Sequence, residues 1–219
     1  MRVGGFIIPV NFDLFSLVAV AFVVLAVLII VWGLARIARE RRFHFFHMSS
    51  GLVLLLFGLL VLAIAGWAQT YRALTHNEWV ADIHAVPTRS QTMQVTYTPV
   101  TNGGTMGTPQ TYTVLGDEWT LGGDVIKWQD WVNILGVDTG YRVTRLMGYY
   151  DNPNDYKTKV VSAYTLDGGN DTMQQFLRDH QNLVPFVRAT YGNDVRMYPN
   201  ATATYQVFVS TSGYWTAQK

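Results

Sequence analysis

Two long apolar runs stand near the start of the chain, with a short basic segment between them. The first run covers residues 14–35 and the second covers residues 51–68, and neither contains a charged side chain. A helix rises about 1.5 Å per residue, so about 20 apolar residues suffice to cross a hydrocarbon core of about 30 Å. The pattern therefore predicts a transmembrane helical hairpin over residues 1–76, with helices at about 10–37 and 49–71 and a loop over 38–48.

The charge of the connecting segment predicts how this hairpin is oriented. Four arginines lie there against a single acidic residue, Glu40; they are Arg36, Arg39, Arg41 and Arg42. Positive side chains near helix ends remain on the cytoplasmic side of a membrane. We therefore expect a bacterial inner-membrane protein with a cytoplasmic loop, two periplasmic termini and the lipid bilayer as a partner. The alternative for the first run is a cleaved signal peptide, but signal peptides carry their positive charge before a shorter apolar region.

Small residues recur at every seventh position in both apolar runs. They are Ala19, Ala26 and Gly33 in the first run and Gly51, Gly58 and Ala65 in the second. Seven residues make nearly two turns, so each set lies on one helix face, where small side chains let two backbones approach closely. An antiparallel hairpin aligns the two sets, and we expect them to form its packing surface. The same faces also allow self-association of two copies.

From Val80 onward the apolar positions follow a period of two. Met93, Val95 and Tyr97 alternate with polar residues, which predicts a half-buried strand. The glycine-rich stretch VTNGGTMGTPQ, residues 100–110, then predicts a wide hairpin with a returning strand at Gln110–Leu115. Other segments rich in β-branched and aromatic residues predict strands at 118–121, 125–128, 141–150, 159–166 and 202–211.

Two helical segments interrupt the predicted strands, one after Asp171 and a short turn between Trp128 and Gly136. The fold class expected from these patterns is a membrane-anchored α+β chain. In it, the hairpin precedes a mainly antiparallel β domain over residues 77–219 that lies outside the cytoplasm.

Composition excludes several kinds of chemistry. The net charge is +1, which gives no electrostatic footprint for a nucleic-acid partner. The chain has no cysteine, so disulfides, thiolate metal sites and cysteine nucleophiles are excluded. Ser210 and Ser212 lack the G-x-S-x-G context of a serine nucleophile.

Three groups of polar residues are candidate chemical sites. His44 and His47 in the loop suit a metal or a pH sensor, but they also suit interfacial anchoring of a turn. A second group shares strand parity and suits a divalent cation or a solvated face: His76, Glu78, Asp82 and His84. A third group suits acid–base work or surface ion pairs: Asp117, Glu118 and Asp124, near Lys127. The plain structural interpretation is favoured for each, so the sequence predicts no enzyme, no cofactor and no metal.

Aromatic residues cluster in one part of the predicted β domain. They are Trp119, Trp128, Trp131, Tyr141, Tyr149 and Tyr150. Such residues are enriched in ligand grooves and protein interfaces, although core packing explains many of them. An exposed patch, if formed, would centre on Trp128 and Trp131.

Two segments carry a resemblance to a known family. GDEWTLGGDVIKWQDWVNILGVDTGYRVTRLMGYYDN at residues 116–152 and LVPFVRATYGNDVRMYPNATATYQVFVSTSGYWTAQ at residues 183–218 are similar to segments of an uncharacterised family of bacterial inner-membrane proteins. The resemblance implies a two-helix hairpin followed by a periplasmic domain, and it supplies no catalytic residues. Some members are labelled multidrug transporter or cation/multidrug efflux pump. That label suits this chain poorly, because transporters build their central sites from many helices.

These observations favour a non-catalytic function over the alternatives. We expect an accessory or structural subunit of a larger inner-membrane protein complex that presents a periplasmic β-rich domain to its partner. The alternative is a membrane-anchored periplasmic module that binds or senses a ligand through the aromatic cluster. An efflux-associated protein, or an enzyme acting through Asp117, Glu118 or the histidines next to the membrane, is less favoured.

Overall fold

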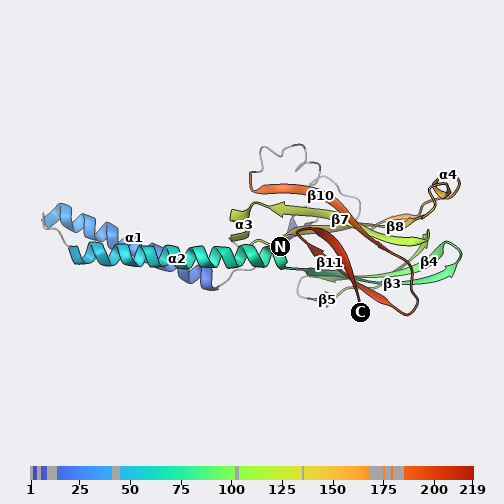
Figure 1. The fold of residues 1–219 in the computed structure, drawn as a ribbon, viewed down its shortest axis with the longest axis horizontal. Helices are drawn as coiled ribbons and strands as arrows, with labels where there is room; N and C mark the ends of the chain where they lie inside the picture. The colour runs from blue at the N-terminus through green and yellow to red at the C-terminus, as the bar shows by residue number, and fades with distance from the viewer. Residues whose placement is uncertain are drawn as a thin grey trace. The chain divides into compact units, whose positions relative to one another are not determined.

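The chain folds into two compact units in the computed structural model (Figure 1). Residues 2–3, 6–8, 14–40, 45–101, 104–134, 136–167, 175, 179 and 185–219 are described. The β unit comprises Met1–Pro9, Leu74–Gln129 and Asp138–Lys219. The helical unit comprises Val10–Ala73 and Asp130–Val137.

The helical unit is a pair of long helices with one short helix. Its helices are α1 (Leu14–Glu40), α2 (Phe45–Thr75) and α3 (Asp130–Ile134). The long helices pack closely at Gly58, where a Cβ atom would lie 3.1 Å from Val23 Cγ2. Next to this contact, the rings of Phe22 and Phe57 meet edge to face with centroids 5.9 Å apart. A bulky residue at position 58 would therefore push the helices apart.

The structure describes the surroundings of some of the predicted packing residues. Ala26 and Ala65 are buried, as is Gly58. The neighbours of Gly58 are Phe22 and Val23, about one turn away from Ala26, the partner expected from sequence. The surroundings of Ala19, Gly33 and Gly51 lie outside the described residues.

The predicted transmembrane hairpin is corrected by the structure. Within the described part of the chain, no helix is both long enough and apolar enough to cross a membrane.

This finding also overturns the predictions that depended on the hairpin. They are the membrane-anchored fold class, the description as a membrane protein, and the inner-membrane location with periplasmic termini. The side chains of Arg36 and Arg39, and Arg41 and Arg42 entirely, lie outside the described residues. The same holds for His44 and for the side chain of His47.

The β unit contains two antiparallel sheets that face each other (Figure 1). The first sheet has the order β1–β2–β8–β7–β10, with β9 also paired to β8. Its strands are β1 (Arg2–Val3), β2 (Phe6–Ile7), β7 (Glu118–Trp128), β8 (Gly140–Tyr149), β9 (Ala163–Thr165) and β10 (Val187–Met197). The short helix α4 (Asp155–Thr158) lies between β8 and β9 along the chain.

The second sheet has the order β12–β11–β3–β4–β5, with β6 also paired to β4. Its strands are β3 (Glu78–Arg89), β4 (Thr92–Thr101), β5 (Thr105–Met106), β6 (Gln110–Leu115), β11 (Thr204–Ser210) and β12 (Gly213–Gln218). Alternate residues of the two sheets form one core, as in a β-sandwich. Trp119, Leu121 and Leu146 contribute from the first sheet, and Ile83 and Val95 from the second.

A β-bulge in β8 determines which of its side chains face this core. Pairing with β7 passes from Gly122–Arg145 to Gly123–Val143, so Thr144 is an extra residue on β8. Side chains alternate along a strand, and an inserted residue therefore reverses the alternation. As a result Tyr141, before the bulge, and Leu146, after it, are both core residues.

Several predicted elements agree with those observed. The strand predicted at Gln110–Leu115 is β6 with the same bounds, and α3 occupies the predicted helical turn. The strands predicted at 118–121 and 125–128 form a single strand, β7. The short β1 and β2, and the long β10, were not predicted. The helix expected after Asp171 lies outside the described residues.

Gly148 provides a test of the sheet packing. A Cβ atom at this position would lie 1.8 Å from the backbone oxygen of Leu115 in the opposite sheet. We expect Gly148→Ala to reduce the free energy of unfolding of the β unit by about 3 kcal/mol or more, because backbone must move. Hydrogen–deuterium exchange of β8 peptides in the full chain measures this loss.

Gly192→Ala is the matched control. A Cβ at Gly192 would have its nearest neighbour at 3.9 Å, so there is room for it. We expect this variant to change stability by less than about 1 kcal/mol. Equal destabilisation by the two substitutions would contradict the close contact between Gly148 and the Leu115 backbone.

Candidate functional site

A cavity of about 460 Å³ lies within the β unit. It is lined by strands of both sheets, by β2 and β8 of the first and by β3, β4 and β6 of the second, and by residues 166–167. Its volume is in the range of small-molecule sites, about 300–1,000 Å³. The walls combine aromatic and aliphatic side chains with the charged residues Arg142 and Asp167.

Arg142 is held beside this cavity by two carboxylates. Its Nη2 donates to Asp124 Oδ2 at 2.6 Å, and its Nε lies 3.4 Å from Asp167 Oδ2. Asp124 and Arg142 are paired positions on β7 and β8, so the sheet register brings these two charges together. The guanidinium also lies 4.9 Å from the centre of the Phe6 ring. These contacts fix the orientation of Arg142.

Among these three side chains, Asp167 is more exposed than Arg142 and Asp124. The Arg142 and Asp124 side chains are 2% and 5% exposed, whereas the Asp167 side chain is 12% exposed. Buried ion pairs gain attraction at a high desolvation cost, and removal of one partner leaves an uncompensated charge. Asp124 therefore anchors Arg142 inside the protein, while Asp167 is the carboxylate that reaches the cavity wall.

Two glycines and a tyrosine complete the surroundings of this cluster. A Cβ at Gly123 would lie 2.4 Å from Tyr214 Oη and 2.3 Å from the Arg142 carbonyl oxygen, so the tyrosine lies directly over the glycine. Burial, followed by the charge of Asp124, raises the pKa of the Tyr214 hydroxyl well above its usual value. At Gly122, a Cβ would meet the Arg145 side chain at 3.0 Å.

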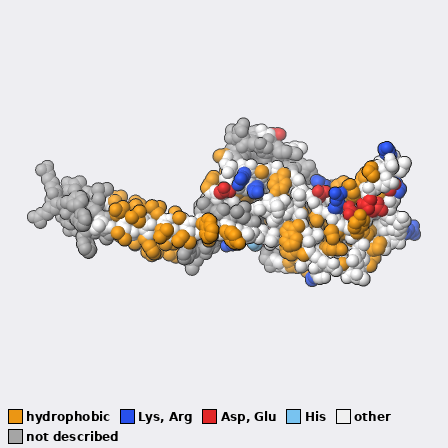
Figure 2. Space-filling model, in the orientation of Figure 1, with side chains coloured by type: hydrophobic (Ala, Val, Ile, Leu, Met, Phe, Trp, Pro, Cys, Tyr) orange, Lys and Arg blue, Asp and Glu red, His pale blue; other side chains and the backbone are white. Residues whose placement is uncertain are grey.

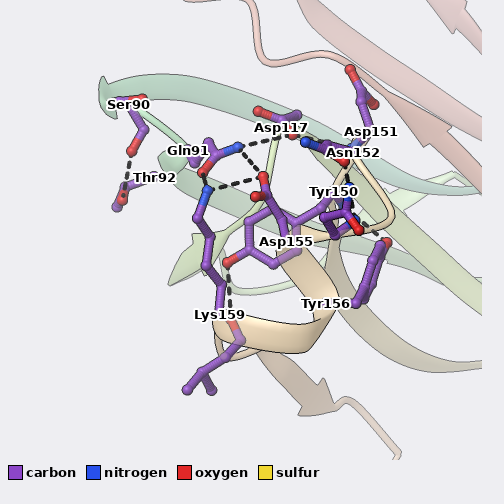
Figure 3. A network of polar contacts seen from close by, with 12 residues as sticks. Ser90, Gln91, Thr92, Asp117, Tyr150, Asp151, Asn152, Asp155, Tyr156 and Lys159 are labelled. Carbon is purple, nitrogen blue, oxygen red and sulfur yellow. Dashed lines mark hydrogen bonds and ion pairs between the residues drawn. The ribbon is translucent and has the colours of Figure 1, made fainter.

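A second polar cluster joins the β3–β4 turn to α4 (Figure 3). Gln91 Nε2 donates to Asp155 Oδ2 at 2.8 Å and to Asp117 Oδ2 at 3.3 Å. Lys159 Nζ lies 2.9 Å from the same Asp155 oxygen and also donates to Gln91 Oε1. The hydrogen bonds from Lys159 and then Gln91 lower the pKa of Asp155.

This network stabilises an unusual backbone conformation at Gln91. Gln91 has a φ of 53°, a left-handed backbone conformation that is unfavourable for residues other than glycine. Its amide contacts three partners at once, which stabilises the turn in that conformation. Asp117 Oδ2 also accepts a hydrogen bond from the Asp151 backbone N–H at 3.1 Å, so its carboxylate ties two loops together.

The three carboxylates considered for acid–base chemistry do not all lie in one site. Asp117 belongs to the network of Gln91, and Asp124 pairs with Arg142. Glu118 lies 3.9 Å from Arg196 Nε, and burial, then the charge of Asp151, raises its pKa. The structure thus separates Asp124 from the other two.

The histidine group expected near residues 76–84 is also divided. His76 Nε2 lies 2.9 Å from Glu78 Oε2. Asp82 instead accepts from Trp79 Nε1 at 2.8 Å, and His84 Nδ1 lies 3.0 Å from the Ala203 carbonyl oxygen. Among the described residues, no group of three such ligands is placed to hold a metal ion.

The aromatic residues predicted to form a patch have different environments. Trp119 and Tyr141 are core residues, with 0% and 1% exposure. Trp128 donates from Nε1 to the Asp138 carbonyl at 2.8 Å and is also buried. Trp131 is 55% exposed on α3, and Tyr149 is 37% exposed beside Arg196. Burial of Trp119, Trp128 and Tyr141 removes them from any exposed surface.

Sequence reasoning missed Arg142 and Asp167. An arginine inside the apolar segment GYRVTRLMGYY is itself a signal, because a charged residue within a buried strand requires a partner. That partner, Asp124, is predicted from sequence only as a candidate for acid–base work or a surface ion pair. The hydroxyl oxygens of Ser210 and Ser212 are hydrogen-bonded at 2.7 Å in the β11–β12 turn, which gives these serines a structural role.

Comparisons with known proteins give no relative: no family model, curated protein or solved structure matches the chain. The resemblance of residues 116–152 and 183–218 to an inner-membrane family therefore stays a prediction.

Tyr97, on the cavity wall, provides a pH test of this geometry. Burial, with a smaller effect from Tyr112, raises the pKa of its hydroxyl from 10.0 to about 12. In the unfolded chain this hydroxyl ionises near pH 10, and in the folded protein it keeps its proton until about pH 12. The contribution of Tyr97 to folding stability is therefore fully present below pH 10 and is lost as the pH rises toward 12.

Substitution of Tyr97 by phenylalanine isolates this effect. Between pH 9 and pH 11, the native chain should lose about 1.4 kcal/mol more stability than Tyr97→Phe, since the variant has no proton to lose. Urea unfolding of both chains at these two pH values measures the difference. Equal losses would contradict the burial of the Tyr97 hydroxyl.

Proposed function

We propose that this chain is a non-catalytic accessory or structural subunit of a larger protein complex. The helical unit docks on an apolar surface of the partner protein, and the β unit is the folded domain that the complex displays. The proposal is supported chiefly by the exposed apolar surface of the two long helices. No membrane location is part of it.

The exposed side chains follow both helices over most of their described length. They are Leu17, Val18, Val20, Val24, Leu25, Val27, Leu28, Val31 and Trp32 on α1, and Leu52, Val53, Leu56, Phe57, Leu59, Leu60, Ile64, Trp67 and Tyr71 on α2. Figure 2 shows hydrophobic side chains along the visible face of these helices. Their exposure is high, reaching 75% at Trp67.

Water is an unfavourable surrounding for such a surface. Full burial of a Leu, Val or Phe side chain is favourable by about 1.5–3 kcal/mol of free energy relative to leaving it exposed to water. Single-chain proteins rarely leave contiguous apolar patches larger than a few hundred Å², and larger ones mark interaction sites. The contact between α1 and α2 uses small residues such as Ala26 and Gly58, so the larger side chains remain available for a partner.

The β unit supports the non-catalytic part of the proposal. Several of its described carboxylates form ion pairs or hydrogen bonds that stabilise turns and strands, as Asp155 does with Lys159 and Asp117 with Gln91. Its candidate catalytic groups are dispersed among separate contacts. An enzyme would require a nucleophile or base with a suitably placed second group.

Co-purification tests this function directly. The tagged full chain, extracted with a mild detergent from cells that naturally produce it, should retain one other protein in fixed stoichiometry, identified by mass spectrometry. The double substitution Leu56→Gln with Leu60→Gln should reduce recovery of that protein at least tenfold, because two apolar contacts are lost.

The control changes an apolar residue of the β unit that is more exposed than Leu56 and Leu60. Val160 is 75% exposed, and Val160→Gln should leave recovery unchanged. Equal recovery with the double helix variant, or the absence of any stoichiometric protein, would overturn the proposal. Recovery of a second copy of the chain alone would assign the surface to self-association instead.

A further inference from the structure

We propose that the cavity between the two sheets of the β unit binds a small uncharged organic molecule through a carbonyl oxygen. That oxygen accepts hydrogen bonds from the Tyr97 hydroxyl and the Gln110 amide, and the apolar body of the molecule lies against the aliphatic wall. The cavity lies wholly among residues of the β unit. The site therefore does not depend on the subunit role proposed for the helical unit.

Tyr97 supplies the first hydrogen-bond donor. The residue is only 7% exposed, belongs to the core and lines the cavity. Within the described part of the chain its hydroxyl makes no hydrogen bond, and it is not one of the side-chain groups that are sealed from solvent without a partner. A polar group in such a buried side chain requires a partner. The cavity is the space in which Tyr97 can meet one.

Gln110 supplies a second donor next to the first. Tyr97 and Gln110 are paired positions on β4 and β6, and both line the cavity. Side chains of directly opposed residues lie on one face of a sheet, with Cβ atoms about 5 Å apart. The Tyr112 hydroxyl donates to Gln110 Oε1, so Tyr112 occupies the acceptor of this amide and leaves its Nε2 group as the donor.

Two neighbouring donors suit a carbonyl oxygen. Such an oxygen has two lone pairs and can accept from both groups at once. The Tyr97 hydroxyl keeps its proton for this purpose, because burial raises its pKa to about 12. Hydrogen bonds are also electrostatically stronger where water is largely excluded. A ligand that only donates hydrogen bonds would leave the amide of Gln110 without an acceptor.

The charged residues at the cavity favour an uncharged ligand. Arg142 and Asp167 both line it, and they have opposite signs, with Arg142 Nε 3.4 Å from Asp167 Oδ2. Arg142 also forms the 2.6 Å pair with Asp124. These groups are therefore engaged with protein partners, and the carbonyl site uses none of them. An ionic ligand would lose its water without gaining a free countercharge, which is costly.

The remaining wall suits an apolar body. Six aliphatic residues from both sheets and from the segment after β9 contribute to it: Ile7, Val80, Pro99, Val100, Val143 and Leu166. Apolar surface with a small number of well-placed polar groups is the usual composition of a small-molecule site. Contact with this wall removes apolar surface of the ligand from water, while the two donors determine its orientation.

Four probes of equal non-hydrogen atom count test the preference with the full chain: acetophenone, indole, benzoate and phenethylammonium. Each contains a benzene ring. Acetophenone offers a carbonyl, indole only donates, and the other two are an anion and a cation. Isothermal titration calorimetry should give acetophenone a Kd of about 1 mM or lower. The other three should bind at least about fivefold more weakly, because each lacks the neutral acceptor.

Two substitutions assign this binding to the cavity. Tyr97→Phe keeps the ring but removes the donor, and should weaken acetophenone at least about fivefold. The matched control Tyr198→Phe removes a hydroxyl from a tyrosine that is 59% exposed and outside the cavity lining, and should not change the Kd. Thr101→Trp, at an exposed residue of the lining, should block entry of acetophenone. Circular dichroism verifies the fold of each variant.

Four results would overturn the proposal. The first is no binding of acetophenone at about tenfold above the expected Kd. The second is equal binding of indole, which would remove the need for an acceptor. The third is preference for benzoate or phenethylammonium, which would make charge the basis of recognition. The last is unchanged affinity in a folded Tyr97→Phe or Thr101→Trp variant, which would show that the probe binds elsewhere.

Discussion

The extra residue in β8 is the constraint on which the organisation of the β unit depends. Thr144 has no counterpart on β7, so the alternation of β8 reverses at that point. Tyr141 and Leu146 can then both enter the core, and Gly148 can face Leu115 of the opposite sheet. A regular strand would direct one of these ends outward. The bulge also leaves Arg142 opposite Asp124, which fixes the charged wall of the cavity.

The two units present different kinds of surface to their surroundings. The β unit buries its large side chains between two sheets and uses its charges in specific pairs. The helical unit packs through small residues and leaves large apolar side chains exposed. One unit is therefore organised around its own core, whereas the other presents apolar surface that is suited to a partner. This contrast is the physical basis of the proposed subunit role.

Local pattern predicted the elements whose signals agree with each other. The strand Gln110–Leu115 alternates in polarity and follows a glycine-rich turn, so its bounds could be read directly from sequence. The long apolar runs predicted two helices, although their assignment to a membrane was wrong. At Gln110–Leu115, strand periodicity and turn residues indicate the same element, whereas the helices follow from the length of the apolar runs alone.

Other elements required information that local pattern does not contain. Gly122 and Gly123 resemble a turn, and so 118–128 was divided into two strands; in the structure both glycines lie inside β7, where Arg145 and Tyr214 leave little room for a side chain. Gly192, in β10, likewise lies within a strand paired with β7. The pair of Asp124 and Arg142 depends on sheet register, as does the cavity beside it.

The central claim is that a different protein covers the exposed apolar surface of the helices. Photo-crosslinking in cells that naturally produce the chain tests it most directly, with benzoyl-phenylalanine placed at Leu56 and, as a control, at Val160. The account predicts that illumination joins position 56 to one other protein, while position 160 gives no such product. Crosslinking of position 56 to no protein, or only to a second copy of this chain, would contradict it.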